Sequence, residues 1–233
     1  MTTPPRIYPM GDRAVLVEFG SRIDAALSRR IAALARRLRA QPPAGVLDVV
    51  PAYTTLAVHY DPAALGAGAY EALAQSLGTW LTREAGDEPP PARTVEIPVC
   101  YGGAYGEDLE AVASRCGMTA AGVVALHSGA AYHVHMLGFV PGFAYLGGLD
   151  ARLAVPRRDS PRTRVPAGSV AIAGGQTAVY PLDTPGGWHI IGRTPLKLFR
   201  ADAVPPCLLD AGDGVRFVAI PEARFTALAG GPA

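Results

Sequence analysis

The chain has 233 residues, of which 49% are hydrophobic and 18% are charged, and its formal net charge is +1. This is the composition of an ordinary globular protein and excludes a disordered or fibrous one. A net charge so close to zero creates no overall field to attract nucleic acid or an anionic membrane, so we expect neither as a partner.

The cysteines and the first residues of the chain exclude further classes of protein. The cysteines Cys100, Cys116 and Cys207 form no CxxC pair, and the sequence has no HExxH stretch or close His/Cys cluster. We therefore expect neither a metal site nor a disulfide framework. Residues 1–10 hold no apolar signal-peptide core, and no run of about 18 apolar residues is present to span a membrane. These patterns are typical of a cytoplasmic protein.

The first part of the chain mixes strand-like and helix-like patterns. Short apolar runs predict strands at residues 14–19, 46–50, 55–60 and 95–99. Apolar residues at helical spacing predict two helices, one over 24–39 and one from Asp61 through Leu81. The order strand, helix, strand, strand, helix, with the strand near residue 95 added, suggests a small ferredoxin-like α+β unit over residues 1–88.

The best linker candidate is Glu88–Pro91, which reads EPPP. Three successive prolines cannot continue a helix and favour a stiff, extended spacer. We therefore divide the chain into an N-terminal domain, residues 1–88, and a second domain, residues 89–233.

The second domain begins with two short helical patterns, at 107–116 and 119–128, which Asp108 or Thr119 could cap. Short β-like segments follow, separated by many glycines and prolines, at residues 169–173, 178–180, 188–191, 196–199 and 215–220. Many short strands with such punctuation favour a β-barrel or sandwich.

General catalytic and nucleotide-binding motifs are missing. The sequence has no GxxxxGK[ST] phosphate loop and no GxGxxG after a strand, and Ser169 lies in PAGSVA, which is not a GxSxG elbow. A self-contained nucleotide fold and a Ser-His-Asp hydrolase are therefore not expected.

The first unusual stretch is Tyr132–Leu146. In a strand, His133 and His135 would lie on the same face, two residues apart. The glycines and proline that follow would turn the chain and present Phe139, Phe143 and Tyr145. The stretch fits a ligand site, and it equally fits a barrel strand followed by a packed aromatic turn.

The second unusual stretch is Arg152–Arg164, which contains five arginines and runs into Gly168 and Ser169. An arginine-rich loop beside glycines suits a carboxylate or phosphoryl group, since a guanidinium binds such groups with two parallel hydrogen bonds. Arg157, between Pro156 and the turn, is our preferred residue for this role. A solvated basic loop is the alternative.

The third unusual stretch contains two glycine pairs, in Gly174–Thr177 and Pro185–Trp188, and ends near Arg193. Glycines such as Gly187 let backbone N–H groups approach a ligand closely, and Gln176 can both donate to and accept from an amide. A Gly-Gly hairpin turn without any ligand is the alternative.

Long segments of the chain resemble one protein family. They are HMLGFVPGFAYLGGLDARLAVPR (135–157), VPAGSVAIAGGQTAVYPLDTPGGWHIIGRTP (165–195), GDRAVLVEFG (11–20), PAYTTLAVHYDP (51–62) and IPVCYGGAYGEDL (97–109). The sequence is similar to the family that contains the B subunit of 5-oxoprolinase, allophanate hydrolase subunit 1 and the KipI-type kinase inhibitors. The resemblance covers nearly the whole chain and is specific for the family, but less so for one function within it.

The resemblance implies an α+β protein with a small N-terminal domain followed by a cyclophilin-like β-barrel. It also implies one component of an ATP-dependent enzyme that cleaves 5-oxoproline to glutamate. ATP would bind at an interface shared with partners, namely a homologous barrel protein, similar to the C subunit of 5-oxoprolinase, and a LamB/YcsF-type protein, its A subunit. Two other functions stay open: inhibition of a sensor histidine kinase, and one half of an amide carboxyltransferase.

The family and the three stretches together give a set of candidate residues. The candidate catalytic residues are His135, Arg157, Gln176 and Arg193. The candidate substrate-binding residues are Phe143, Tyr145, Gly168, Ser169 and Gly187.

Overall fold

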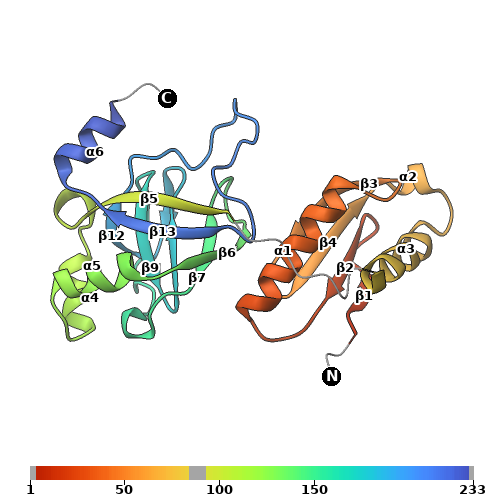
Figure 1. Cartoon of the computed structure of the whole chain (residues 1–233), viewed down its shortest axis with the longest axis horizontal. Helices are drawn as coiled ribbons and strands as arrows, with labels where there is room; N and C mark the ends of the chain where they lie inside the picture. Colours follow the sequence, from red (N-terminus) through yellow and green to blue (C-terminus); the bar gives the residue numbers. More distant parts are fainter. Residues whose placement is uncertain (1–3, 84–92, 231–233) are drawn as a thin grey trace. The chain divides into compact units, whose positions relative to one another are not determined.

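The computed structural model describes residues 4–83 and 93–230 (Figure 1). Contacts between residues divide the chain into two compact units, Met1–Pro91 and Ala92–Ala233. The predicted linker Glu88–Pro91, and with it the predicted boundary between residues 88 and 89, lies outside the described residues.

The N-terminal unit is a four-stranded antiparallel sheet with helices on one face. The strand order is β1-β2-β4-β3, with the bounds β1 (Arg6–Pro9), β2 (Ala14–Glu18), β3 (Val46–Pro51) and β4 (Thr55–Tyr60). The two long helices are α1 (Ala25–Ala40) and α3 (Ala69–Arg83). Both helices contribute leucines to one core with Val15 and Val17 of β2, so they cover the same face of the sheet.

Local chemistry explains how the helices of this unit begin and end. The carboxylate of Asp24 accepts a hydrogen bond from the Leu27 N–H at 2.8 Å, which caps α1. The predicted single helix from Asp61 to Leu81 is wrong: it is two helices, α2 (Pro62–Leu65) and α3. Gly66 and Gly68 lie between them with φ of 73° and 75°, a left-handed conformation that ends a helix.

The fourth strand of this sheet was predicted wrongly. It is β1, whereas the segment near residue 95 is β5 (Thr94–Tyr101) of the second unit. An apolar run identifies a strand but not its partner, and β5 pairs in parallel with β13 (Gly214–Ala219), far away in sequence. The ferredoxin-like assignment of the N-terminal unit stays a prediction.

The second unit is a closed barrel, which confirms the predicted β-barrel. Its strand order is β10-β7-β6-β13-β5-β12-β9. Its other strands are β6 (Tyr132–Leu137), β7 (Ala144–Gly147), β9 (Ser169–Ala173), β10 (Gln176–Val179) and β12 (His189–Arg193). The predicted strand at residues 196–199 is wrong, because Phe199 makes only an isolated bridge to Cys207. The α+β class is confirmed.

Short elements surround the barrel. Two of them, α4 (Leu109–Arg115) and α5 (Ala120–Gly129), match the predicted helices, and Thr119 caps α5 through the Gly122 N–H. The others are α6 (Glu222–Ala229) and a two-stranded sheet of β8 (Arg162–Val165) and β11 (Thr184–Gly186). Within the described ranges no single helix could cross a membrane, although α4 and α5, bent by 93°, would meet the length and composition test as a pair.

The barrel interior is a continuous apolar core. Each of the seven strands contributes to it, and α4 and α5 add Val112 and Val123. Because successive side chains of a strand point to opposite faces, Val170 and Ile172 of β9 lie in this core while Ala171 and Ala173 lie in a second cluster. That second cluster lies on the outer face of the barrel.

One polar chain of hydrogen bonds runs through the interior. The fully buried His127 of α5 is bonded through Nδ1 to the Tyr101 hydroxyl at 2.7 Å and through Nε2 to Thr177 Oγ1 at 2.9 Å. The Thr177 hydroxyl donates to the carbonyl of Ala171. His127 therefore donates through Nε2 and accepts through Nδ1, so every member of the chain is satisfied by a neutral imidazole.

This arrangement predicts acid sensitivity of the barrel. Burial lowers the pKa of His127 to about 3, whereas an exposed histidine in the unfolded chain has a pKa of about 6.5. Between these values the unfolded state binds more protons, so stability is fully present above pH of about 6.5 and is lost as the pH falls toward 3, by up to roughly 1.4 kcal/mol per pH unit.

The test compares urea unfolding of the wild type and of His127→Gln at pH values between 7 and 5. Trp188 fluorescence reports unfolding of the barrel unit, and Trp80 is replaced by Phe in both proteins. Glutamine can also donate and accept, but it does not titrate. We expect the wild-type stability to fall more steeply with acidification than that of the variant. Equal slopes would show that His127 does not couple folding to protonation.

Candidate functional site

The outer face of the barrel carries a second apolar cluster, drawn from neighbouring strands. It consists of Phe143, Val165, Ala171, Ala173, Ala178, Tyr180, Trp188 and Ile190. Ala171 of β9 lies opposite Ala178 of β10 on one side and Ile190 of β12 on the other. Three small alanines of the sheet thus leave room for the large aromatic side chains above them.

Strand register places three predicted site residues on this outer face. Gln176 lies opposite Ala173, and Arg193 lies opposite Ser169, so all three predicted residues share the face of Ala171. Ser169 and Ala173 are four positions apart on β9, a distance of about 13 Å along the strand. Gln176 and Arg193 therefore stand at opposite ends of the same face.

Phe143 is the centre of the aromatic cluster. Its ring lies edge-on to those of Tyr145, Tyr180 and Trp188, at centroid distances of 5.0, 5.3 and 6.0 Å. Phe143 is 2% exposed, whereas Tyr145 is only partly buried. Phe143 is therefore enclosed by its neighbours in the cluster, and Tyr145 is the one of these two predicted residues with an exposed part that a ligand can touch.

A further aromatic residue, Phe139, stands at the edge of this cluster. Its ring is 5.5 Å from that of Phe143 and it is 63% exposed. Its φ of 72° is uncommon for a residue with a side chain. The tight turn between β6 and β7 fixes this conformation, because the Gly138 N–H bonds to the Phe143 carbonyl and the Phe143 N–H bonds to the Val140 carbonyl.

Four of the five arginines in the 152–164 loop form ion pairs with aspartates. Arg152 pairs with Asp150, Arg164 pairs with Asp183, and Arg158 and Arg162 both bind Asp108. Arg157 is exposed and makes no ion pair with any described residue. The preferred role of Arg157 as an anion-binding residue stays a prediction, but its guanidinium is not committed to a carboxylate of the described chain.

Burial and nearby charges determine the pKa values here. Burial alone would raise the pKa of Asp108, but hydrogen bonds from Arg162 and the Ile190 N–H, with the charges of Arg162 and Arg158, lower it below its usual range. Burial raises the pKa of Tyr180, although a backbone hydrogen bond at Trp188 and the charge of Arg157 oppose this shift. Asp108 is thus ionised and Tyr180 is neutral near pH 7.

Arg193 and Ser169 each present a buried polar atom. Arg193 Nε and Ser169 Oγ have no hydrogen-bond partner among the described residues, and the two residues are cross-strand neighbours. Buried donors of this kind are normally satisfied. Next to them, Gly168 has φ of 80°, and a Cβ atom there would lie 2.4 Å from the Thr194 carbonyl oxygen. Glycine is therefore required at this position for backbone reasons.

The predicted catalytic residue His135 lies on β6, beside the aromatic face. It is 5% exposed, and its Nδ1 is 3.3 Å from Nε2 of His133. Gly147 of β7 leaves space for the ring, since a Cβ atom there would be 2.3 Å from His135 Nε2. No group of three or more metal-ligating side chains occurs in the described part of the chain, so the pair is a hydrogen-bonded dyad.

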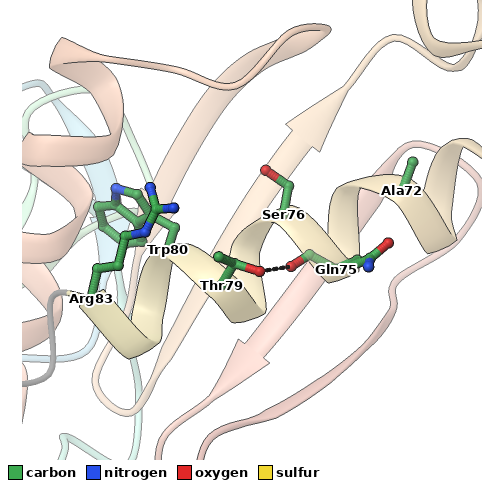
Figure 2. A pocket seen from close by; sticks show the side chains of 6 residues that line it. All are labelled: Ala72, Gln75, Ser76, Thr79, Trp80 and Arg83. Atoms are coloured by element: carbon green, nitrogen blue, oxygen red, sulfur yellow. Dashed lines mark hydrogen bonds between the residues drawn. The ribbon is translucent and has the colours of Figure 1, made fainter.

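Two cavities lie in the N-terminal unit and contain none of the predicted site residues. One, of about 560 Å³, lies between β1 and the helices α1 and α3 and is lined mostly by apolar side chains. The other, of about 430 Å³, lies along α3 (Figure 2), where the Thr79 hydroxyl donates to the Gln75 carbonyl oxygen. Six side chains of a single helix line it, so it is a surface groove.

Comparison with known proteins decides the family. The model of the family described as "Carboxyltransferase domain, subdomain C and D" matches residues 5–209.

The chain belongs to this carboxyltransferase-domain family.

Two relatives in the family are similar over nearly their whole length, and both are B subunits of 5-oxoprolinase. That of Bacillus subtilis (strain 168) is 43% identical over 97% of this chain and 98% of its own. That of Escherichia coli O157:H7 is 46% identical over 91% of this chain and 95% of its own. The crystal structure of the K. lactis urea amidolyase shares the fold, with a TM-score of 0.71 at 18% identity over 96% of this chain and 15% of that one.

Sequence patterns missed several residues of the candidate site. Tyr180 and Trp188 complete the aromatic cluster, and Asp108, proposed only as a helix cap, makes no capping bond and instead binds two arginines. Trp188 lies inside the glycine-rich stretch that drew attention to Gly187. Asp108 could have been suspected from the excess of arginines over acids in the loop, since such a loop needs a carboxylate from elsewhere.

Gly168 and Gly187 make a matched pair for testing which site glycine is structural. Gly168→Ala places a Cβ atom against backbone in a left-handed conformation, so we expect it to destabilise the barrel by about 2 kcal/mol or more. At Gly187 a Cβ atom would meet nothing closer than 3.7 Å and φ is not positive, so Gly187→Ala should change stability by less than about 1 kcal/mol. Urea unfolding of both variants measures this, and equal losses would contradict it.

Proposed function

We propose that this chain is the B subunit of an ATP-dependent 5-oxoprolinase and that it needs partner subunits to cleave 5-oxoproline to glutamate. The observation that carries the proposal is 43% identity over almost the full length of a relative of that name. Because the similarity extends through both units of the chain, it is not confined to a shared barrel fold.

The chemistry of 5-oxoproline fits the residues of the outer face. The molecule has one carboxylate and one lactam, and a lactam carbonyl is a poor electrophile that must be activated before water attacks it. ATP supplies that activation when bound, by phosphorylation of the amide oxygen. The task of this chain is then to hold the amide and to stabilise negative charge near it.

The outer face has hydrogen-bond donors that can bind an anion. Arg193 has a buried Nε without an acceptor among the described residues, and Arg157 is not engaged in an ion pair there. In the proposed function these two guanidinium groups hold the substrate carboxylate and the phosphoryl group. Gln176, which has both a donor and an acceptor, binds the lactam amide, and Tyr145 forms an apolar wall.

The remaining predicted residues have supporting roles in this proposal. His135, which is hydrogen-bonded to His133, acts as a proton carrier in this proposal. Ser169, Gly168 and Gly187 shape the backbone around Arg193 and the aromatic cluster. Phe143 keeps Tyr145 in place through its edge-on contact.

The proposed active site is shared with other chains. The sequence has no phosphate loop, so ATP binds at an interface with a homologous barrel protein of the C-subunit type, and a LamB/YcsF-type protein, the A subunit, completes the enzyme. We expect the purified chain alone to show no 5-oxoproline-dependent ATP hydrolysis. Addition of both partners should create it, measured as glutamate and ADP formed together.

Two results would count against this proposal. Robust turnover by the isolated chain would contradict the shared site. No turnover by the complete mixture, with biotin-dependent carboxylation appearing instead when a biotin carboxylase is added, would favour an amide carboxyltransferase half.

Arg193→Lys tests anion binding in the reconstituted complex. Lysine keeps the charge but loses the planar pair of donors, so we expect activity to fall at least about tenfold, or roughly 1.4 kcal/mol, with little change in melting temperature. Arg216→Lys is the matched control, because Arg216 is exposed on β13 and, among the described residues, forms an ion pair only with Glu96. An equally large loss of stability in Arg193→Lys would indicate that Arg193 only ties a turn to the barrel.

A further inference from the structure

Asp108, just before α4, is a buried carboxylate with three hydrogen bonds from elsewhere in the barrel unit. It is 6% exposed. Its Oδ1 accepts from Arg158 Nη1 at 3.1 Å and from Arg162 Nη2 at 2.9 Å. Its Oδ2 accepts from the Ile190 N–H of β12 at 2.7 Å. One side chain thus joins the arginine loop to the strand that forms the floor of the outer face.

The loop is tied on both sides of Arg157. Before it, the carbonyl of Pro156 accepts a hydrogen bond from His189 Nε2 at 2.9 Å. After it, the backbone N–H of Arg158 donates to the Gly187 carbonyl at 2.8 Å, and the Arg158 side chain reaches Asp108. The backbone on either side of Arg157 is therefore fixed, while its guanidinium stays exposed.

The loop that carries Arg157 runs past the aromatic cluster, because the Arg158 N–H bonds to the carbonyl of Gly187, the residue before Trp188. The charge of Arg157 acts on the Tyr180 hydroxyl of the same cluster, and Tyr180 packs against Phe143 at its centre.

We infer that Asp108 is a positioning residue, which holds the loop 156–162 on the barrel so that Arg157 meets the anionic group of the substrate. The inference rests on the proposed function, and it names a residue that acts through another and not on the substrate itself.

Burial of an ion pair is a costly way to stabilise a loop, which supports this role. Desolvation offsets much of the attraction, and apolar replacements of buried ion pairs are often as stable or more so. Two guanidinium groups share the single Asp108 carboxylate, and Arg158 Nε and Arg162 Nη1 are buried without a partner among the described residues. This arrangement fixes the orientation of the two guanidinium groups, and with them the loop, because hydrogen bonds to a carboxylate constrain where a planar guanidinium can lie.

The test compares Asp108→Asn with Glu107→Gln in the reconstituted complex. Glu107 is the matched control: it adjoins Asp108 and binds the same Arg162, but it is 58% exposed, so its loss should matter little. We expect Asp108→Asn to raise the KM for 5-oxoproline at least about fivefold, with a smaller change in kcat, and Glu107→Gln to leave both within about twofold. Arg158→Gln serves as a second variant if Asp108→Asn does not fold.

A double-mutant cycle separates positioning from general damage. In an Arg157→Gln background, Asp108→Asn should raise KM no further, because the residue through which it acts is gone. An equal further rise in that background, or no rise in KM from Arg157→Gln alone, would overturn the inference.

Hydrogen exchange of the complex distinguishes failure of this inference from failure of the proposed function. Asp108→Asn should increase exchange in residues 156–162 and at Ile190, and Glu107→Gln should not. If the wild-type complex cleaves no 5-oxoproline, the proposed function is wrong, whatever the exchange shows. If the complex is active but exchange in the loop is unchanged by Asp108→Asn, Asp108 does not hold the loop.

Discussion

Strand β9 of the barrel is covered by side chains on both faces, and the two-residue alternation along it divides its side chains between two cores. In β9, Val170 and Ile172 belong to the interior, and Ala171 and Ala173 belong to the outer cluster. The strand is buried throughout, so no simple polar-apolar alternation marks it in the sequence. The outer face can hold Phe143, Tyr180 and Trp188 because the residues beneath them are small.

Two buried polar side chains connect other elements to the barrel strands, one as a neutral group and the other as a charged group. His127 is neutral and satisfied on both ring nitrogens, so it joins α5 to β5 and β10 without a charge inside the barrel. Asp108 is charged and joins the arginine loop to β12. The first is sensitive to acid, and the second depends on its arginine partners being present.

Most helices and several strands could be predicted from periodicity and caps, as with Asp24 before α1 and the apolar stripe that follows it. Pairing could not, because partners lie far apart: β5 resembled a continuation of the N-terminal sheet, yet it pairs with β13 about 120 positions later. The predicted helix through Leu81 failed at Gly66 and Gly68, where helical spacing of the leucines concealed a break.

For the site, glycine-rich motifs and arginines indicated the correct region, and strand register shows that Gln176, Ser169 and Arg193 share one face. Their order along that face, the burial of Phe143 and the partners of each arginine depend on the folded chain. Sequence could not say that Arg158 and Arg162 are bound by Asp108 while Arg157 is not, since the carboxylate lies about 50 residues earlier.

The length of the outer face bears on how it would be used. Gln176 and Arg193 stand near its two ends, about 13 Å apart along the strands, and a five-membered lactam with one carboxylate covers only part of that length. Phe143, Tyr180 and Trp188 cover the alanines between these ends, so in the proposed function ligands bind at the ends of the face and not at its middle. At one end the buried Arg193 Nε lacks a partner among the described residues, and in the proposed function an acceptor from the substrate or from a partner chain would satisfy it.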